Sequence, residues 1–196
     1  GDDGNLQRGR QWPSPRFINN GNGTITDTMT GLMWARVDCI SSDICARNWE
    51  WMFRVINDLN NFETSSINIS RAFAAEYTAR YTDWRAPNVL ELESLINTGH
   101  ANPDLWLNSQ GFTLINLGSC YWTSTTSAES MIMKWMILMS DGSVGTKNGM
   151  RDDCSPMAVR GPVMPGTSKL WKTGQTLSDD PLGQNRDDGG IQAGVR

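Results

Sequence analysis

Few residues in this sequence have the types and spacing that catalysis requires. The chain contains one histidine, His100, in the stretch NTGHANPD, and no nucleophile motif lies near it. A Ser–His–Asp or Cys–His device needs a histidine beside its nucleophile. The carboxylate pairs Asp152-Asp153 and Glu91/Glu93 could exchange protons, but neighbouring positions on a strand or helix point to different faces. The sequence therefore predicts a protein that is not an enzyme and has no cofactor.

The cysteines suggest a different chemistry. There are four of them, Cys39, Cys45, Cys120 and Cys154, with no C-x-x-C pair and only one histidine to join them. A zinc site would need paired ligands at short, regular spacing, so no metal site is expected. Two disulfides, Cys39–Cys45 and Cys120–Cys154, fit an even count in a loop-rich chain, and four buried free thiols are the alternative. Disulfides would place the protein outside a reducing cytosol.

Composition excludes two classes of partner. The formal net charge of the 196 residues is −4, whereas a nucleic-acid binder normally displays a basic face. The most apolar run, MIMKWMILM, is about half as long as the roughly 20 residues that a membrane-spanning helix needs, and it contains Lys134. We therefore expect neither nucleic-acid binding nor insertion into a membrane.

The two ends of the chain resemble each other. DDGNLQRGRQ (2–11) and DDGGIQAGVR (187–196) share Asp-Asp-Gly, Gln and Gly in the same order. Self-similarity of this kind predicts a tandem architecture. We expect residues 1–10 to be the end of a linker between repeats, 11–161 to be one domain, and 162–196 to be a linker leading to a second copy, whose start is the repeated segment.

Two amphipathic helices are expected. Behind Asn48, a plausible N-cap, apolar residues recur at helical spacing. They are Met52, Val55, Ile56 and Leu59. A second helix starts in PNVLELESLIN, where Asn88 and Glu91 have the spacing of a capping box.

The remaining pattern is that of short strands and turns. Residues 15–37 contain an Asn-Gly-Asn-Gly turn and predict a hairpin that leads into a strand through Leu32, Met33 and Trp34. From Gly118 onward the sequence alternates between strand-like runs and turns, and Asp141-Gly142 is a strong hairpin signal.

Five blocks of this sequence, in this order, resemble the Lcl C-terminal domain family. They are PRFINNGNGTITDTMTGLMW, YTDWRAPNVLELESLI, YWTSTTSA, KWMILMSDGSV and AVRG, and together they span about residues 11–161. The resemblance implies an α+β, C-type-lectin-like fold in which two helices pack on a small twisted antiparallel sheet with many loops. It also implies adhesion or ligand display without catalysis. Some relatives are variable proteins of diversity-generating retroelements.

The sequence departs from this family in several ways. Leu138 stands where a polar residue is usual before the hairpin, and Ala158 stands where a cysteine is common. The Glu-Pro-Asn and Trp-Asn-Asp triplets of calcium-dependent lectins are missing, so calcium-dependent sugar binding is not supported. The tryptophans of the matched blocks are expected in the core. They are Trp34, Trp84, Trp122 and Trp135.

The methionine run suggests where a ligand could bind. Strand alternation assigns Trp135, Ile137 and Met139 to the core and leaves Lys134, Met136 and Leu138 on the other face. Methionine is favoured on surfaces that adapt to partners, and a contiguous exposed apolar patch marks an interaction site. The alternative is that both faces are covered, either within one copy or by self-association. The predicted ligand-binding residues are Met131, Met133, Lys134, Met136, Leu138, Thr146, Asn148, Met150, Arg151 and Asp152.

These observations predict a recognition module on a cell or virion surface, outside the cytosol, that binds a protein or a glycan through its C-terminal strands and loops. A retroelement variable protein with a diversified form of this site is one alternative. A structural spacer, whose apolar patch packs on the next tandem copy, is another.

Overall fold

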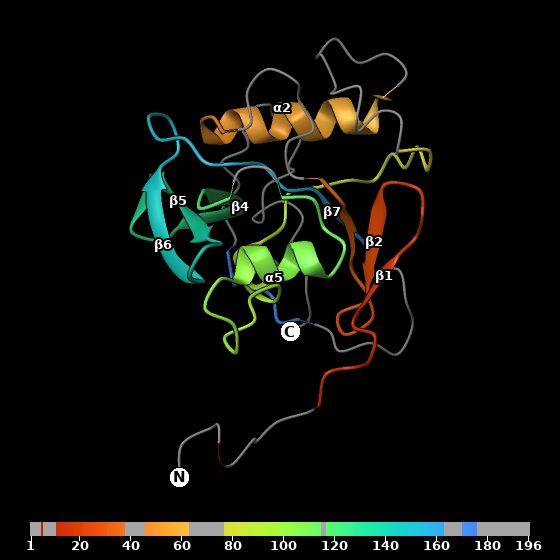
Figure 1. Cartoon of the computed structure of the whole chain (residues 1–196). Coiled ribbons are helices and arrows are strands. Elements are labelled where there is room, and N and C mark those ends of the chain that lie inside the picture. Colours follow the sequence, from red (N-terminus) through yellow and green to blue (C-terminus); the bar gives the residue numbers. More distant parts are fainter. Residues whose placement is uncertain are drawn as a thin grey trace.

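The structure, a computed structural model, describes residues 5, 11–37, 46–62, 77–114, 117–162 and 170–175. Within these residues the chain is a mixed α+β structure with two antiparallel sheets (Figure 1). The predicted Cys39–Cys45 pair and most of both repeated end segments lie outside the described residues. The tandem arrangement therefore stays a prediction.

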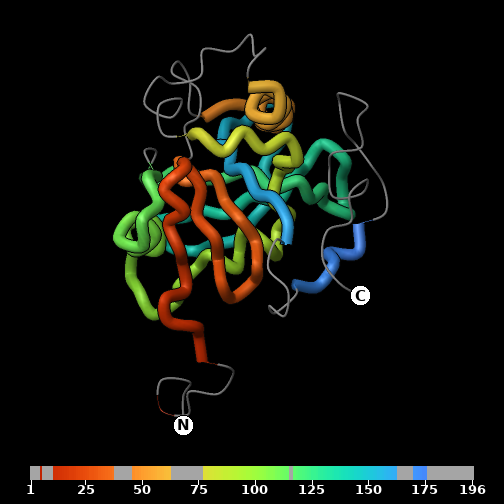
Figure 2. The backbone as a smooth tube through the Cα atoms, turned by 90° about the vertical axis from the view of Figure 1, so that its right-hand side faces the viewer, coloured from red at the N-terminus to blue at the C-terminus, as the bar shows by residue number. Residues whose placement is uncertain are grey.

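One sheet has four strands in the order β1-β2-β3-β7, and the other has three in the order β4-β5-β6. The strands of the first sheet are β1 (Phe17–Asn19), β2 (Thr24–Asp27), β3 (Met33–Ala35) and β7 (Val159–Arg160). Those of the second are β4 (Cys120–Ser127), β5 (Ser130–Leu138) and β6 (Ser143–Asn148). Figure 2 shows β7, from the C-terminal half of the chain, beside the N-terminal strands.

The predicted N-terminal hairpin is confirmed. Strands β1 and β2 pair antiparallel with Ile18 opposite Thr26, and β3 follows after a second turn. The Asn-Gly-Asn-Gly turn needs its second glycine for two reasons. Gly23 has φ +82°, and a Cβ there would lie 2.8 Å from the Tyr77 Cα, so a side chain would be both strained and blocked.

Helix α2 (Trp49–Asn60) confirms the first predicted helix. The Asn48 side chain accepts a hydrogen bond from the Trp51 backbone N–H at 3.2 Å and so caps the helix. The four apolar residues at helical spacing are all buried. This face of α2 therefore anchors the helix to the rest of the domain.

The second predicted helix is α4 (Val89–Glu93), and its capping box between Asn88 and Glu91 is present. Glu91 is buried and also accepts two hydrogen bonds of 2.6 Å from the Arg85 guanidinium. A third helix, α5 (Pro103–Ser109), begins with a proline in its first turn and was not predicted. The described residues thus form three helices and two sheets, rather than the expected two helices on one sheet.

Two hydrophobic clusters lie on opposite faces of the sheets. The cluster around α2 includes Cys120 and Trp122 of β4, with Met136 and Leu138 of β5 packed against it. The cluster beside α4 and α5 includes the alternate residues Tyr121, Ile137 and Met139. Both faces of strands β4 and β5 are therefore covered, whereas no residue of β6 is buried. Trp34, Trp84 and Trp122 are buried as predicted, whereas Trp135 is only half-buried.

The predicted disulfide Cys120–Cys154 is present, with both cysteines buried. It links the start of β4 to the segment after β6. Part of the predicted C-terminal linker also contacts the domain. Leu170 packs against the cluster of α4 and α5, and the Gln175 side chain accepts a hydrogen bond from the Thr126 backbone N–H.

We predict that Glu91→Gln lowers the free energy of unfolding by about 3 kcal/mol, because it leaves the Arg85 charge without its carboxylate partner. Urea denaturation measures the change. The matched control is Glu93→Gln on the same helix, where the side chain is exposed, and it should change stability by no more than about 0.5 kcal/mol. Equal losses in the two variants would contradict a structural role for the Arg85–Glu91 pair.

Candidate functional site

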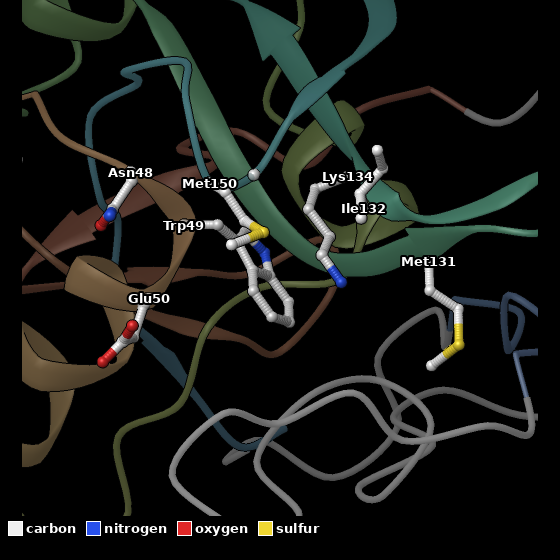
Figure 3. A pocket seen from close by; sticks show the side chains of 8 residues that line it. Asn48, Trp49, Glu50, Met131, Ile132, Lys134 and Met150 are labelled. Atoms are coloured by element: carbon white, nitrogen blue, oxygen red, sulfur yellow. The ribbon is translucent and has the colours of Figure 1, made fainter.

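An open pocket of about 370 Å³ lies where the N-terminus of α2, the start of β5 and the turn after β6 meet (Figure 3). Its lining residues come from three separate parts of the chain. They are Asn48, Trp49, Glu50, Met131, Ile132, Lys134, Gly149 and Met150.

The Trp49 ring forms the base of this pocket, and a hydrogen bond and an aromatic contact fix its position. Its Nε1–H donates to the Thr123 carbonyl at 2.7 Å, and its ring packs edge-on against Phe53 with centroids 4.6 Å apart. The Trp49 backbone N–H donates to the Gly149 carbonyl at 2.9 Å. Since Gly149 N–H in turn donates to the Ile132 carbonyl at 2.8 Å, backbone hydrogen bonds join all three parts of the pocket.

Lys134 lies over this base. Its ammonium is 3.9 Å from the centroid of the Trp49 ring and donates to Thr126 Oγ1 at 3.1 Å. The residue is only 3% exposed. Burying an ammonium group is costly unless other groups compensate for its lost hydration, and the face of a tryptophan is a favourable partner for a cation. The charge therefore stands at the inner side of the pocket, held in a defined position.

The rim is apolar and exposed. Met131, Ile132 and Met150 have 51%, 50% and 75% of their surface accessible. Strand β6 ends at Asn148, opposite Met133 of β5. The first residues of β5 extend past this end, so side chains on both faces of the strand reach solvent. In Figure 3, Met131 and Met150 lie on different sides of the Lys134 side chain.

The prediction that Lys134, Met136 and Leu138 form an uncovered face is wrong. Lys134 is buried under α2, and Met136 and Leu138 are partly buried against the cluster that contains α2. The expectation assumed that only one face of the strand is covered. Helix α2 covers the second face, so the alternative of two covered faces within one copy holds for the strand from Lys134 onward.

The other predicted site residues do not line the pocket. Thr146 pairs with Trp135 and therefore lies on the opposite sheet face from Lys134. Asn148 and Asp152 hold the turn that follows β6. The Asn148 side chain accepts from the Met150 N–H at 3.0 Å, and the Asp152 carboxylate accepts from the Asn148 N–H at 2.8 Å. Met133 is half-buried and Arg151 is exposed.

The residues considered for catalysis lie apart from the pocket. His100 is exposed and stacks on Trp106, with ring centroids 5.7 Å apart. Glu91 is bound to Arg85, while Glu93 and Asp153 are exposed. In the β5–β6 turn, the backbone hydrogen bond from Ser143 lowers the pKa of Asp141 below its ordinary value.

The described residues contain neither a cluster of metal-ligating side chains nor a helix long and apolar enough for a membrane. No group of three or more metal-ligating side chains comes together in this part of the chain. Each helix within the same ranges is too short or too polar to cross a bilayer.

Sequence reasoning missed five of the lining residues. The sequence indicates a helix start at Asn48 and Trp49, but nothing in it indicates that these residues or Glu50 line a pocket. Gly149 is part of an Asn-Gly turn, and Ile132 lies inside the methionine run but is not among the predicted ligand-binding residues. Their convergence depends on how α2 packs across the sheet, which no local pattern in the sequence specifies.

The family model that describes the Lcl C-terminal domain matches residues 23–160, well over half of the chain. The chain belongs to the Lcl C-terminal domain family. The resemblance noted from the sequence is thus confirmed. A comparison with curated proteins finds no match. All eight lining residues of the pocket fall within the matched part of this Lcl C-terminal domain.

In this Lcl C-terminal domain, Gly149→Ala should lower the free energy of unfolding by about 1–3 kcal/mol, because overpacking a buried site forces neighbours to shift. The new Cβ would lie 2.7 Å from Lys134 Cγ and 3.1 Å from Trp49 Cβ. The control is Gly145→Ala, whose closest contact is the flexible end of Met136 at 3.2 Å. Thermal unfolding of both variants measures the difference, and a Gly149 variant as stable as the control would contradict the described packing.

Proposed function

We propose that this Lcl C-terminal domain is a non-enzymatic recognition module with a C-type-lectin-like fold, which binds a protein or glycan ligand at the pocket beside Lys134. The observation that carries the proposal is the exposure of three large apolar side chains around one hollow, at Met131, Ile132 and Met150. Apolar pockets with a few fixed polar groups are the usual form of a binding site.

The packing around the pocket supports this proposal. The base is held by the Trp49 hydrogen bond and by the backbone links through Gly149, so the site is formed before a ligand arrives. The rim is built largely from methionine, which adapts its shape at low cost. The fixed base limits the conformational freedom that is lost on binding, while the methionine rim can adjust to the shape of the ligand.

Display outside the cytosol belongs to the same proposal. The Cys120–Cys154 disulfide links the start of β4 to the segment after β6. Such bonds persist in oxidising surroundings and are rare in the cytosol. A domain that is stabilised in this way suits a cell surface or a virion surface.

We predict that the double variant Met131→Ser/Met150→Ser loses about tenfold or more in affinity for its ligand, because it removes most of the exposed apolar surface that a bound ligand would cover. The measurement is a glycan and cell-surface-protein array, followed by titration of each hit. The control is Ile18→Ser/Leu117→Ser, which removes two apolar side chains that are 43% and 46% exposed elsewhere on the surface.

Equal binding by the wild type and the rim variant would contradict the proposal. Sedimentation of both proteins provides a second readout. If the rim variant loses self-association but binds the array ligands as the wild type does, the surface is a contact between copies, as in a structural spacer.

A further inference from the structure

The two outer edges of the β4-β5-β6 sheet differ. Along the outer edge of β4, the backbone N–H of Trp122 donates to the Ser155 carbonyl at 3.1 Å. The backbone N–H of Ser124 donates to the Pro87 carbonyl at 2.7 Å. Neighbouring segments thus cover this edge. Strand β6 is the last strand on the other side of the sheet, and it lies at the left-hand side of the molecule in Figure 1.

The pairing of β6 with β5 determines which of its backbone groups point outward. The Gly149 N–H donates to the Ile132 carbonyl, and residues that bond to the neighbouring strand alternate with residues that do not. Counting back from Gly149, the N–H and C=O groups of Gly145 face β5. Those of Val144 and Thr146 therefore point away from the sheet.

The outward groups of Val144 and Thr146 are the open part of this edge. Asn148 also points outward, but its N–H donates to the Asp152 carboxylate at 2.8 Å and its carbonyl accepts from the Asp152 N–H at 2.9 Å. No residue in the described part of the chain bonds to the outward N–H or C=O of Val144 or Thr146. Unpaired backbone groups at a sheet edge are a template for another strand.

The sequence of β6 is complementary to a second copy of itself. If two copies pair antiparallel about Gly145, Val144 of each lies opposite Thr146 of the other, and four hydrogen bonds join all the open groups. Both residues are β-branched, a type that packs well across strands. At the two-fold axis Gly145 meets its own copy in a non-hydrogen-bonded pair, where side chains come closest, and glycine has none to clash.

The same register keeps like charges apart. Lysine on an edge strand commonly discourages pairing, and Lys147 is the charged residue of β6. About Gly145, however, Lys147 lies opposite Ser143 of the second copy and not opposite another lysine. A register shifted by two residues would place Asn148 opposite Val144, although Asp152 already bonds to the Asn148 backbone. This match of the strand to itself favours a second copy over an unrelated strand.

We propose that β6 pairs antiparallel with β6 of a second copy of this chain, so that two three-stranded sheets form one continuous sheet across a two-fold axis. The contact is separate from the apolar rim of the pocket at Met131, Ile132 and Met150. It therefore goes beyond the proposed function and holds whether or not the pocket binds a ligand.

Sedimentation velocity of the full chain over a concentration series tests the proposal, together with amide hydrogen exchange followed by NMR. We expect a dimer with a dissociation constant below about 0.5 mM. Exchange of the Val144 and Thr146 amides should slow as the dimer forms, because both become hydrogen-bonded. The Met131→Ser/Met150→Ser variant should dimerise as the wild type does.

Thr146→Pro should raise the dissociation constant of the dimer by about 100-fold, because it removes an outward donor and places a ring where the second strand would lie. Proline is tolerated on an edge strand when the missing N–H faces solvent, so the single copy should stay folded. The matched control is Thr146→Ala, which keeps the N–H and should change the constant by about fivefold at most.

Substitutions at Ser143, which is exposed in one copy, test the register. Ser143→Glu should lower the dissociation constant by about fivefold and Ser143→Lys should raise it by a similar factor. The reason is that the two-fold axis places each new side chain opposite Lys147 of the other copy. Equal effects of the two substitutions would overturn the register about Gly145.

Three further results would overturn the proposal. A chain that stays monomeric at about 0.5 mM would leave the edge of β6 to a strand of another protein. A dimer whose Val144 and Thr146 amides exchange as fast as in the monomer would use a different surface. A dimer that is abolished in the Met131→Ser/Met150→Ser variant and retained in Thr146→Pro would place the contact at the rim.

Discussion

Strand β5 buries side chains on both of its faces, and the arrangement of the domain follows from that requirement. Met136 and Leu138 pack toward α2, while Ile137, and Met139 directly after the strand, pack toward α4 and α5. A strand in this position needs a helix layer on each side, because either uncovered face would expose a row of apolar side chains. The disulfide links the start of β4 to the segment after β6, and the Arg85–Glu91 pair joins α4 to the segment that precedes it.

Much of the local structure could be predicted from the sequence. The helix behind Asn48 and the capping box of Asn88 and Glu91 depend on neighbouring residues, and both are present. The same is true of the Asp141-Gly142 turn, where Gly142 has φ +78°. Helix α5 was not predicted because it is short and begins at a proline. Such a segment is equally typical of a loop.

The site was harder to predict because it depends on tertiary packing. Alternation along β5 correctly assigned Ile137 and Met139 to the core, but it could not show that α2 covers the opposite face. The exposed apolar surface of the methionine run is therefore smaller than predicted. It is confined to the start of β5 and to the turn at Met150, where β6 has ended and none of the helices in the described residues covers the rim. Lys134, which was predicted to lie at the surface, is buried and lines the pocket.

Oxidation of the methionines by dilute peroxide, followed residue by residue with mass spectrometry, tests this account most directly. Thioether oxidation depends on access to solvent. Met131 and Met150 should be converted first, Met136 more slowly, and the fully buried Met139 and Met157 last. If Met136 were oxidised as fast as Met131 in the folded protein, the second face of β5 would be uncovered, and the two-sided burial on which the fold and the pocket depend would be refuted.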